Sequence, residues 1–246
     1  MIWHYDGSFE GFLSSVVYSY THHKIPDTIQ AEHPVQTLFE TPLFIPTNTQ
    51  EGKRLFDAID QKLGREILER IYHGYLCDEL PTERDLLLYI RMGFKNKNLL
   101  RDLSHPTVYA VEQYQKRLLS QRHRMLGFLR FEELQGGVLY AKMTPSCNVL
   151  PLLGTHFAKR FGNEHFVIHD LKRKTALIYQ YNEAHIHHVA KFEQPELAQN
   201  EAHVQSLWHS FFNTIAIKER HNPKLQRQWV PLRYRKWMHE FVALQG

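Results

Sequence analysis

Positively charged side chains gather in two stretches of this chain. Residues 101–174 hold 12 Lys and Arg against 6 Asp and Glu, and residues 218–237 hold 7 against 1, whereas the formal net charge of all 246 residues is only +4. Segregated positive charge favours a polyanionic partner, because each cation that meets a phosphate releases a counterion. The candidate nucleic-acid contacts are Lys116, Arg117, Arg122, Arg124, Arg130, Lys159, Arg160, Lys172, Arg173, Lys174, Arg227, Arg233, Arg235 and Lys236.

Aromatic residues alternate with cations in the second basic stretch. Trp229, Tyr234 and Trp237 could stack on unpaired bases, which contributes roughly 1–3 kcal/mol per base. The alternative is that these rings pack the tail onto the core while their basic neighbours face water. The sequence matches no helix-turn-helix, zinc-finger or RNA-recognition signature, so we expect DNA binding without sequence preference.

A histidine beside a carboxylate is the candidate catalytic pair. His169 and Asp170 could act as acid and base on a damaged or modified DNA base, with His156 and His165 nearby in the sequence. On a strand, however, adjacent side chains point to opposite faces, so adjacency alone does not make a catalytic pair.

Three more histidines resemble a metal-binding tract. His185 and His187 would share a face of a strand and could bind one ion, with His188 beside them, but no third ligand is identifiable. We therefore predict no metal site and no cofactor. Cys77 and Cys147 lie too far apart in the sequence for a Cys-x-x-Cys site, and we expect them to be reduced thiols of a cytoplasmic protein.

A short polar turn precedes the first expected helix. Asp6 or Ser8 can cap that helix, with Gly7 between them, and the alternative is a polar loop at the mouth of a site. The Gly136-Gly137 pair predicts a hairpin turn rather than a phosphate-binding loop, because neither standard glycine spacing for such a loop is present.

Apolar periodicity and turn residues predict helices first and strands later. We expect helices at about 9–20, 49–73, 82–97, 106–123, after Asn148 and 195–217, and strands at 125–132, 138–144, 166–170, 175–181 and 184–190. The fold class is α+β, with N-terminal helices, then an antiparallel sheet of two hairpins around a helix, closed by a long C-terminal helix.

Composition places the chain among globular proteins. It is 43% hydrophobic and 23% charged, and it has no apolar run long enough to span a membrane. Its first residues lack the basic region followed by an apolar stretch that marks a secretory signal, so we expect none. We expect a single compact domain over 1–246, in which a helical part, 1–123, docks on a sheet-containing part, 124–246.

Several stretches resemble a family of uncharacterised bacterial proteins known as probable DNA metabolism proteins. The stretches are residues 5–12 (YDGSFEGF), 123–131 (HRMLGFLRF), 148–153 (NVLPLL), 156–161 (HFAKRF), 168–173 (IHDLKR) and 222–228 (NPKLQRQ). Members of that family are typically encoded beside a radical-SAM protein assigned to DNA repair, and they share a region with some uracil-DNA glycosylase-like proteins.

The resemblance implies a bacterial DNA-repair or modification context, with the radical-SAM protein as partner, and it supplies no reaction. The three-cysteine motif of radical-SAM enzymes is absent here, so any such cluster would belong to the partner. We expect a DNA-binding accessory protein; the alternatives are a base-modifying or base-excising enzyme that uses His169 and Asp170, and a protein–protein scaffold without DNA affinity.

Overall fold

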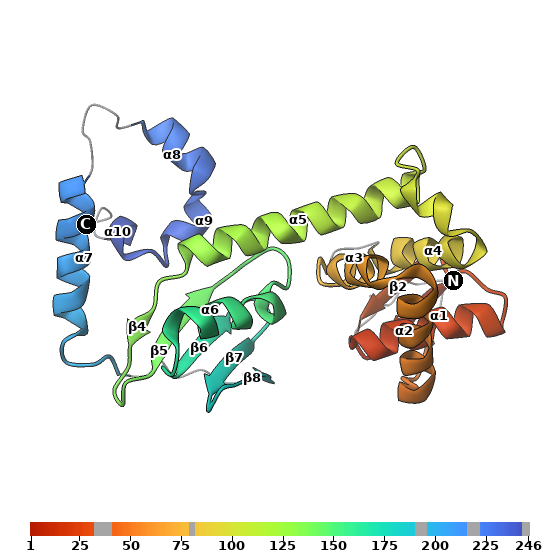
Figure 1. The fold of residues 1–246 in the computed structure, drawn as a ribbon, viewed down its shortest axis with the longest axis horizontal. Helices are drawn as coiled ribbons and strands as arrows, with labels where there is room; N and C mark the ends of the chain where they lie inside the picture. The colour runs from red at the N-terminus through yellow and green to blue at the C-terminus, as the bar shows by residue number, and fades with distance from the viewer. Residues whose placement is uncertain (32–40, 79–81, 190–195, 216–221, 243–246) are drawn as a thin grey trace. The chain divides into compact units, whose positions relative to one another are not determined.

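The structure is a computed structural model that describes residues 1–31, 41–78, 82–189, 196–215 and 222–242. The chain divides into two compact units, Met1–Ser120 and Gln121–Gly246, and the boundary falls inside helix α5 (Pro106–Phe128) (Figure 1). Each unit has a sheet of its own. The expectation of one compact domain over the whole chain stays a prediction.

The first unit contains a parallel three-stranded sheet. β1 (Ile2–Tyr5) lies between β2 (Thr28–Ala31) and β3 (Leu43–Phe44), and Trp3 is in register with Ile29 on one side and Leu43 on the other. Side chains alternate along β1, so Trp3 and Tyr5 are buried while Ile2 and His4 are half-buried.

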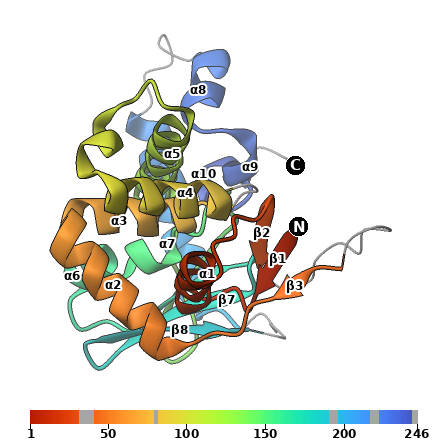
Figure 2. The ribbon, with the colours of Figure 1, turned by 90° about the vertical axis from the view of Figure 1, so that its right-hand side faces the viewer.

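Helices pack against this sheet. Ser8 caps α1 (Phe9–Thr21), because its hydroxyl oxygen accepts a hydrogen bond from the Gly11 backbone N–H at 2.9 Å. The helix packs against α2 (Thr49–Leu63) and also contacts β1 (Figure 2). The chain continues through α3 (Arg65–Tyr75), α4 (Thr82–Lys95) and a 3-10 helix, η1 (Lys97–Arg101), to α5.

The prediction of a single helix over 49–73 is wrong, because the chain breaks at Gly64 into two helices, α2 and α3. Gly64 has φ +96°, a backbone conformation that glycine adopts without the steric cost of a Cβ. The stripe formed by Ile59, Leu63 and Ile71 is nevertheless buried in the core on both sides of the break.

The second unit contains a five-stranded mixed sheet of order β4-β5-β6-β7-β8. β5 (Leu139–Met143) and β6 (Phe166–Asp170) are parallel, and the other neighbouring pairs are antiparallel. Between β5 and β6 the chain forms a 3-10 turn, η2 (Leu150–Leu152), and helix α6 (Gly154–Phe161). The remaining strands are β4 (Glu132–Glu133), β7 (Thr175–Gln180) and β8 (Glu183–His188).

Helix α6 covers the apolar face of this sheet. Phe157 is buried and its ring packs edge-on against Phe166, which in turn stacks on Tyr179 with ring centroids 4.8 Å apart. After β8 the chain forms α7 (Glu201–Ile215), α8 (Pro223–Trp229), α9 (Leu232–Arg235) and α10 (His239–Val242).

The mixed α and β content is confirmed, but the sheets differ from the expected arrangement. Strand β1 precedes the N-terminal helices, and the second sheet is mixed rather than antiparallel, because α6 connects the parallel strands β5 and β6. The strand predicted at 125–132 is wrong over most of its length, because α5 continues to Phe128. The hairpin at Gly136-Gly137 nevertheless forms, since β4 pairs antiparallel with β5 across that turn. A short apolar run such as Met125–Phe128 fits a helix as well as a strand, so its pattern alone does not decide between them.

The C-terminal part also differs from the expected single long helix. Of the predicted segment 195–217, the structure describes α7 as far as Ile215, while Pro195 and Ile217 lie outside the described residues. The basic tail then forms the three short helices α8, α9 and α10, which are separated at Pro231 and around Trp237.

Candidate functional site

The basic tail presents exposed cations and one exposed tryptophan on helices α8 and α9. Asn222 caps α8, accepting a hydrogen bond from the Leu225 N–H at 3.0 Å, and Pro223 occupies the first helical turn. The ring of Trp229 is 72% exposed at the end of α8. We call the exposed cations of this segment, together with its exposed tryptophan, the basic–aromatic surface; they are Lys224, Arg227, Trp229, Arg233 and Lys236.

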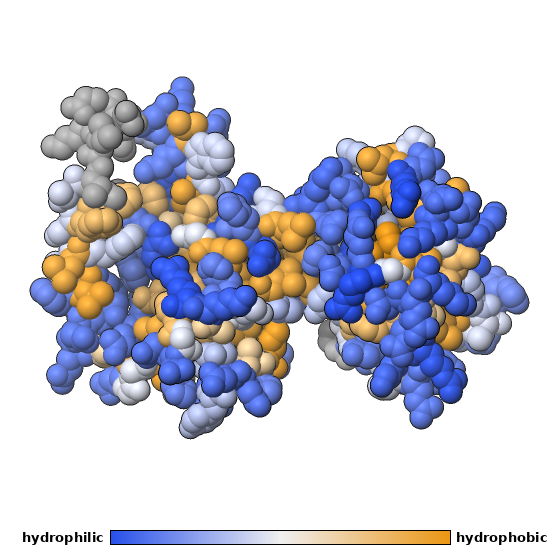
Figure 3. Space-filling model, in the orientation of Figure 1, coloured by the Kyte–Doolittle hydropathy of each residue, from blue (hydrophilic) through white to orange (hydrophobic). Residues whose placement is uncertain are grey.

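The cations of the basic–aromatic surface form no ion pair with any carboxylate in the described part of the chain. Arg233 lies over the ring of Tyr234, 4.8 Å from its centroid, and Lys236 lies 4.7 Å from the centroid of Trp237. Figure 3 shows hydrophilic side chains beside a few hydrophobic ones over α8. Unpaired cations next to an exposed ring can hold phosphates while the ring stacks on a base.

Two residues fix this segment to the second unit. Tyr234 is 3% exposed, and its hydroxyl donates to Oε1 of Gln121 at 2.6 Å. The Nε of Arg235 donates to the Val230 carbonyl at 3.0 Å, and its guanidinium lies over the ring of Phe241. Tyr234 therefore packs against the unit, as the alternative interpretation of the tail expects, whereas Trp229 faces solvent and its stacking on a base stays a prediction.

Several cations of the first basic stretch are held inside the second unit. Arg130 donates to both carboxylate oxygens of Glu240, at 2.6 and 3.2 Å. Arg173 donates to the carboxylate of Asp170 and to the carbonyl of Ser146, both at 2.8 Å. These two guanidinium groups stabilise the fold and are not part of the candidate interface.

Other predicted contacts have partial or local partners. Arg122 donates to the Leu152 carbonyl at 3.2 Å, and Lys172 donates to the Ser146 carbonyl at the same distance. In the first unit, Lys116 forms an ion pair with Glu112 at 3.5 Å, and Arg117 follows it on α5.

The remaining predicted cations lie on other elements of the second unit. The exposed ones are Lys159 and Arg160 at the end of α6 and Lys174 in the turn between β6 and β7, while Arg124 is half-buried on α5. In the described part of the chain, none of these four cations contacts a residue of the basic–aromatic surface.

The two residues of the candidate catalytic pair have different surroundings. The Nδ1 of His169 lies 3.0 Å from the Tyr140 hydroxyl, and burial lowers the pKa of His169, helped by the charge of Lys142 and opposed by that of Asp170. Asp170 is fully buried and accepts hydrogen bonds from the backbone N–H groups of Lys172 and Arg173. Because the two residues are adjacent on β6, their side chains point to opposite faces of the sheet.

The histidine tract lies on β8, the exposed edge strand. The Nε2 of His185 lies 3.0 Å from a carboxylate oxygen of Glu183, and the rings of His185 and His187 are 6.3 Å apart. Within the described ranges, no group of three or more His, Cys, Asp or Glu side chains is placed to hold a metal ion. Cys77 and Cys147 are both buried and form no disulfide.

The comparison with protein families matches residues 81–240 to a domain of unknown function, DUF4130. The chain belongs to this family. No curated protein matches the chain. The DUF4130 segment contains the whole second sheet and the basic–aromatic surface, whereas the three-stranded sheet of the first unit lies before it. None of the described helices has the length and apolar composition needed to cross a membrane.

A buried carboxyl group of the DUF4130 segment was missed by the sequence reasoning. Glu83, in the first turn of α4, is 8% exposed and accepts a hydrogen bond from the Tyr5 hydroxyl at 3.3 Å. Burial raises the pKa of Glu83 to about 7, although hydrogen bonds to its own backbone and to Tyr5 oppose the rise. The sequence shows only an acidic residue at a helix start, which is usually exposed and caps the helix.

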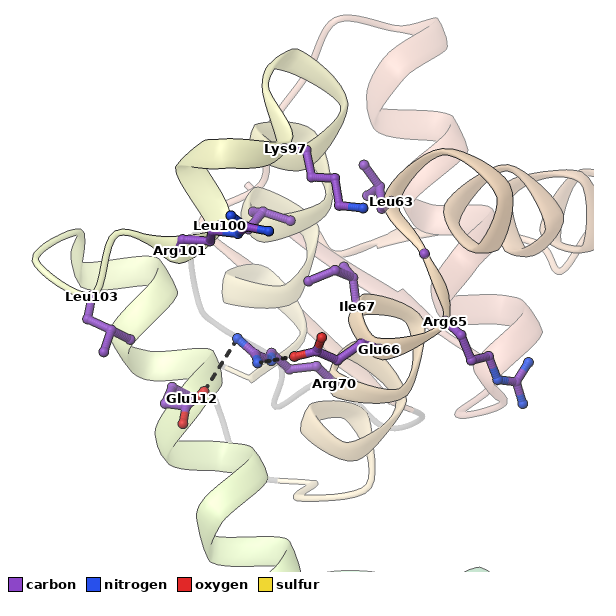
Figure 4. Close-up of a pocket in the computed structure, with 11 residues that line it drawn as sticks. Leu63, Arg65, Glu66, Ile67, Arg70, Lys97, Leu100, Arg101, Leu103 and Glu112 are labelled. Atoms are coloured by element: carbon purple, nitrogen blue, oxygen red, sulfur yellow. Dashed lines mark hydrogen bonds and ion pairs between the residues drawn. The ribbon is translucent and has the colours of Figure 1, made fainter.

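A cavity of about 530 Å³ in the first unit was also missed. It is lined by α3, η1 and α5, and it brings together the cations Arg65, Arg70, Lys97 and Arg101 (Figure 4). Three of these four cations come from residues 1–100. That stretch is acidic as a whole, because it holds 10 Lys and Arg against 14 Asp and Glu. Counting charges along the chain therefore hides a cluster that exists only in the folded unit.

Proposed function

We propose that this DUF4130 protein is a DNA-binding accessory protein of a bacterial DNA-repair or modification system that acts with a radical-SAM partner. One observation supports the DNA-binding part: Trp229 is 72% exposed beside cations that have no carboxylate partner among the described residues. The biological system and the partner rest on the family resemblance of the sequence.

The arrangement favours contacts with the backbone and with unpaired bases. Lys224, Arg227, Arg233 and Lys236 supply four positive charges within 13 residues, and each can neutralise one phosphate. Four such contacts would give the logarithm of the binding constant a slope of about −3 against the logarithm of salt concentration on a single strand. Trp229 can stack on any base, so binding would be independent of sequence.

The two alternatives receive less support. A base-modifying enzyme that uses His169 and Asp170 would need both side chains at one reacting centre, but neighbours on a strand face opposite sides of the sheet. A scaffold without DNA affinity would leave the unpaired cations of the basic–aromatic surface without a role.

Fluorescence anisotropy with labelled single- and double-stranded DNA at several salt concentrations tests the proposal. We expect weak binding that is tighter on single strands, similar for unrelated sequences, and weaker as salt rises. Binding that is absent at low salt, or that does not change with salt, would contradict DNA binding. Co-purification with the radical-SAM protein in that case would select the scaffold.

A further inference from the structure

The cavity of the first unit has an excess of positive charge. Its two lining carboxylates, Glu66 and Glu112, both pair with Arg70, at 3.1 and 3.4 Å, so this guanidinium is held from two sides (Figure 4). Glu112 also pairs with Lys116. The two negative charges of Glu66 and Glu112 are therefore balanced by the positive charges of Arg70 and Lys116.

Two further cations of the cavity have no such carboxylate. Lys97 and Arg101, at the two ends of η1, are exposed and form no ion pair with any described acidic residue. Arg65 is different, because it pairs with Glu69 on α3 at 3.3 Å and its side chain points away from Lys97 and Arg101 (Figure 4). The unbalanced charge of the cavity thus amounts to two cations.

The backbone beside Lys97 adds to this positive potential. The Nζ of Lys97 lies 3.5 Å from the position that a Cβ on Gly64 would occupy, so the ammonium group is directly beside the start of α3. No side chain caps α3, and Gly64, Arg65 and Glu66 all line the cavity. Free N–H groups and the helix dipole attract an anion at such a position, and here they only supplement the two side-chain cations.

We propose that this cavity binds the terminal phosphate monoester of a nucleotide. A phosphate monoester carries about −1.5 to −2 charges at pH 7, which matches the two unbalanced cations. Ile67, Leu100 and the 55% exposed Leu103 add an apolar wall that can contact the nucleoside. A volume of about 530 Å³ falls in the range of small-molecule sites.

The nucleotide can come from two sources, a free mononucleotide or the 5′ end of a DNA strand. The chemistry that the cavity recognises, a terminal phosphate beside a nucleoside, is the same for both. The proposal does not depend on DNA binding by the basic–aromatic surface, because the cavity residues belong to a different unit of the chain.

Calorimetric titration of the full chain with deoxyadenosine monophosphate, inorganic phosphate and deoxyadenosine tests the site. We expect the monophosphate to bind saturably and deoxyadenosine not to bind. The variant Lys97→Gln/Arg101→Gln should bind the monophosphate about tenfold more weakly or worse, because two charge-assisted contacts are lost. Both side chains are exposed, so circular dichroism should show an unchanged fold.

A matched control and a variant of opposite sign sharpen the test. Arg54→Gln/Lys62→Gln removes the same charge from exposed positions on α2 and should leave the affinity unchanged. Glu112→Gln removes a carboxylate from the cavity wall and should tighten binding. Equal affinity of the Lys97→Gln/Arg101→Gln variant and the unmodified chain, or equal binding of deoxyadenosine, would overturn the proposal.

A second titration distinguishes the two sources. An oligonucleotide with a 5′-phosphate is compared with the same strand ending in a 5′-hydroxyl. If the phosphate tightens binding and Lys97→Gln/Arg101→Gln removes the difference, the cavity takes strand ends. If the two strands bind alike while the mononucleotide result holds, the cavity takes free nucleotides. Loss of all strand binding would refute only the DNA-binding proposal, because the mononucleotide result does not depend on it.

Discussion

Arg130 and Glu240 form a two-point ion pair in the second unit. Nη2 of Arg130 lies 2.6 Å from Oε1 of Glu240 and Nε lies 3.2 Å from Oε2, while the indole N–H of Trp208 donates to Oε2 at 3.2 Å. The Glu240 side chain is 3% exposed. The pair joins the chain after α5 to α10, and Trp208 adds α7 to the same cluster.

Breaking this pair should destabilise the protein without changing DNA binding. Arg130→Gln leaves a buried carboxylate unpaired, and we expect a loss of about 3 kcal/mol in the free energy of unfolding. Urea unfolding measures this loss. The salt dependence of DNA binding should stay unchanged, and a smaller salt slope would show that Arg130 contacts phosphate instead.

The same pair should make the second unit sensitive to acid. Burial by itself would raise the pKa of Glu240, but hydrogen bonds from Arg130 and Trp208 outweigh it and lower the pKa. The stabilisation is therefore present above the unfolded-state pKa and is lost as pH falls through the folded-state value. Arg130→Gln should reduce this acid sensitivity in thermal unfolding curves, and identical pH profiles would contradict the assignment.

Glu83 should give the first unit the opposite pH dependence. Because burial raises its pKa from 4.5 to about 7, the folded state binds the proton more tightly than the unfolded state. Stability should fall by an amount on the order of 3 kcal/mol as pH rises from about 4.5 to 7, and then level off. Carbon-13 NMR titration of the Glu83 carboxyl measures the pKa directly.

Two variants check the origin of that pH dependence. Glu83→Gln should remove the decline, whereas Glu51→Gln, at an exposed position on α2, should retain it. A Glu83 carboxyl that titrates near 4.5 would refute the effect of burial.

Asp170 should act in folding rather than in catalysis. Its carboxylate organises the turn after β6 through the backbone N–H groups of Lys172 and Arg173 and through the Arg173 guanidinium. Asp170→Asn should cost about 3 kcal/mol of stability, because it leaves Arg173 without its anionic partner. Thermal unfolding should show a loss that the exposed control Glu164→Gln does not. An unchanged melting temperature would reopen a catalytic role.

Trp229 should contribute to binding of single strands but not to stability. Its ring is 72% exposed, so Trp229→Ala removes few native contacts. Loss of one stacked base should weaken single-strand binding about tenfold and leave double-strand binding almost unchanged. The matched control is Tyr181→Ala, which removes an 82% exposed ring on the same unit and should have no effect in anisotropy titrations. Equal effects of the two variants would argue against stacking by Trp229.

The sequence predicts best where local signals are strong. The strand 166–170 and the start of α4 at Thr82 agree with the structure, because each segment has a clear apolar pattern. The strands β1, β2 and β3 were missed because they are at most four residues long and form a parallel sheet, whose pairing is not local in sequence. Trp3 shows the difference, because it is completely buried on a strand whose register partner on one side is as distant in sequence as Leu43.

The sequence predicts least well which charged side chains are free to contact a phosphate and which are paired within the fold. Arg130 and Arg227 look alike in the sequence, yet one binds a carboxylate 110 residues away while the other faces solvent. Such pairing depends on the tertiary fold, so counting charges along the chain cannot separate structural cations from available ones.

The salt dependence of single-strand binding tests the central claim most directly. It is measured by anisotropy for the unmodified chain, for Arg227→Gln/Arg233→Gln and for the control Arg54→Gln/Lys62→Gln. We predict that the first variant reduces the magnitude of the slope by about 1.4, which corresponds to two lost phosphate contacts, and that the control keeps the original slope. Equal slopes for all three proteins would contradict DNA binding by the basic–aromatic surface.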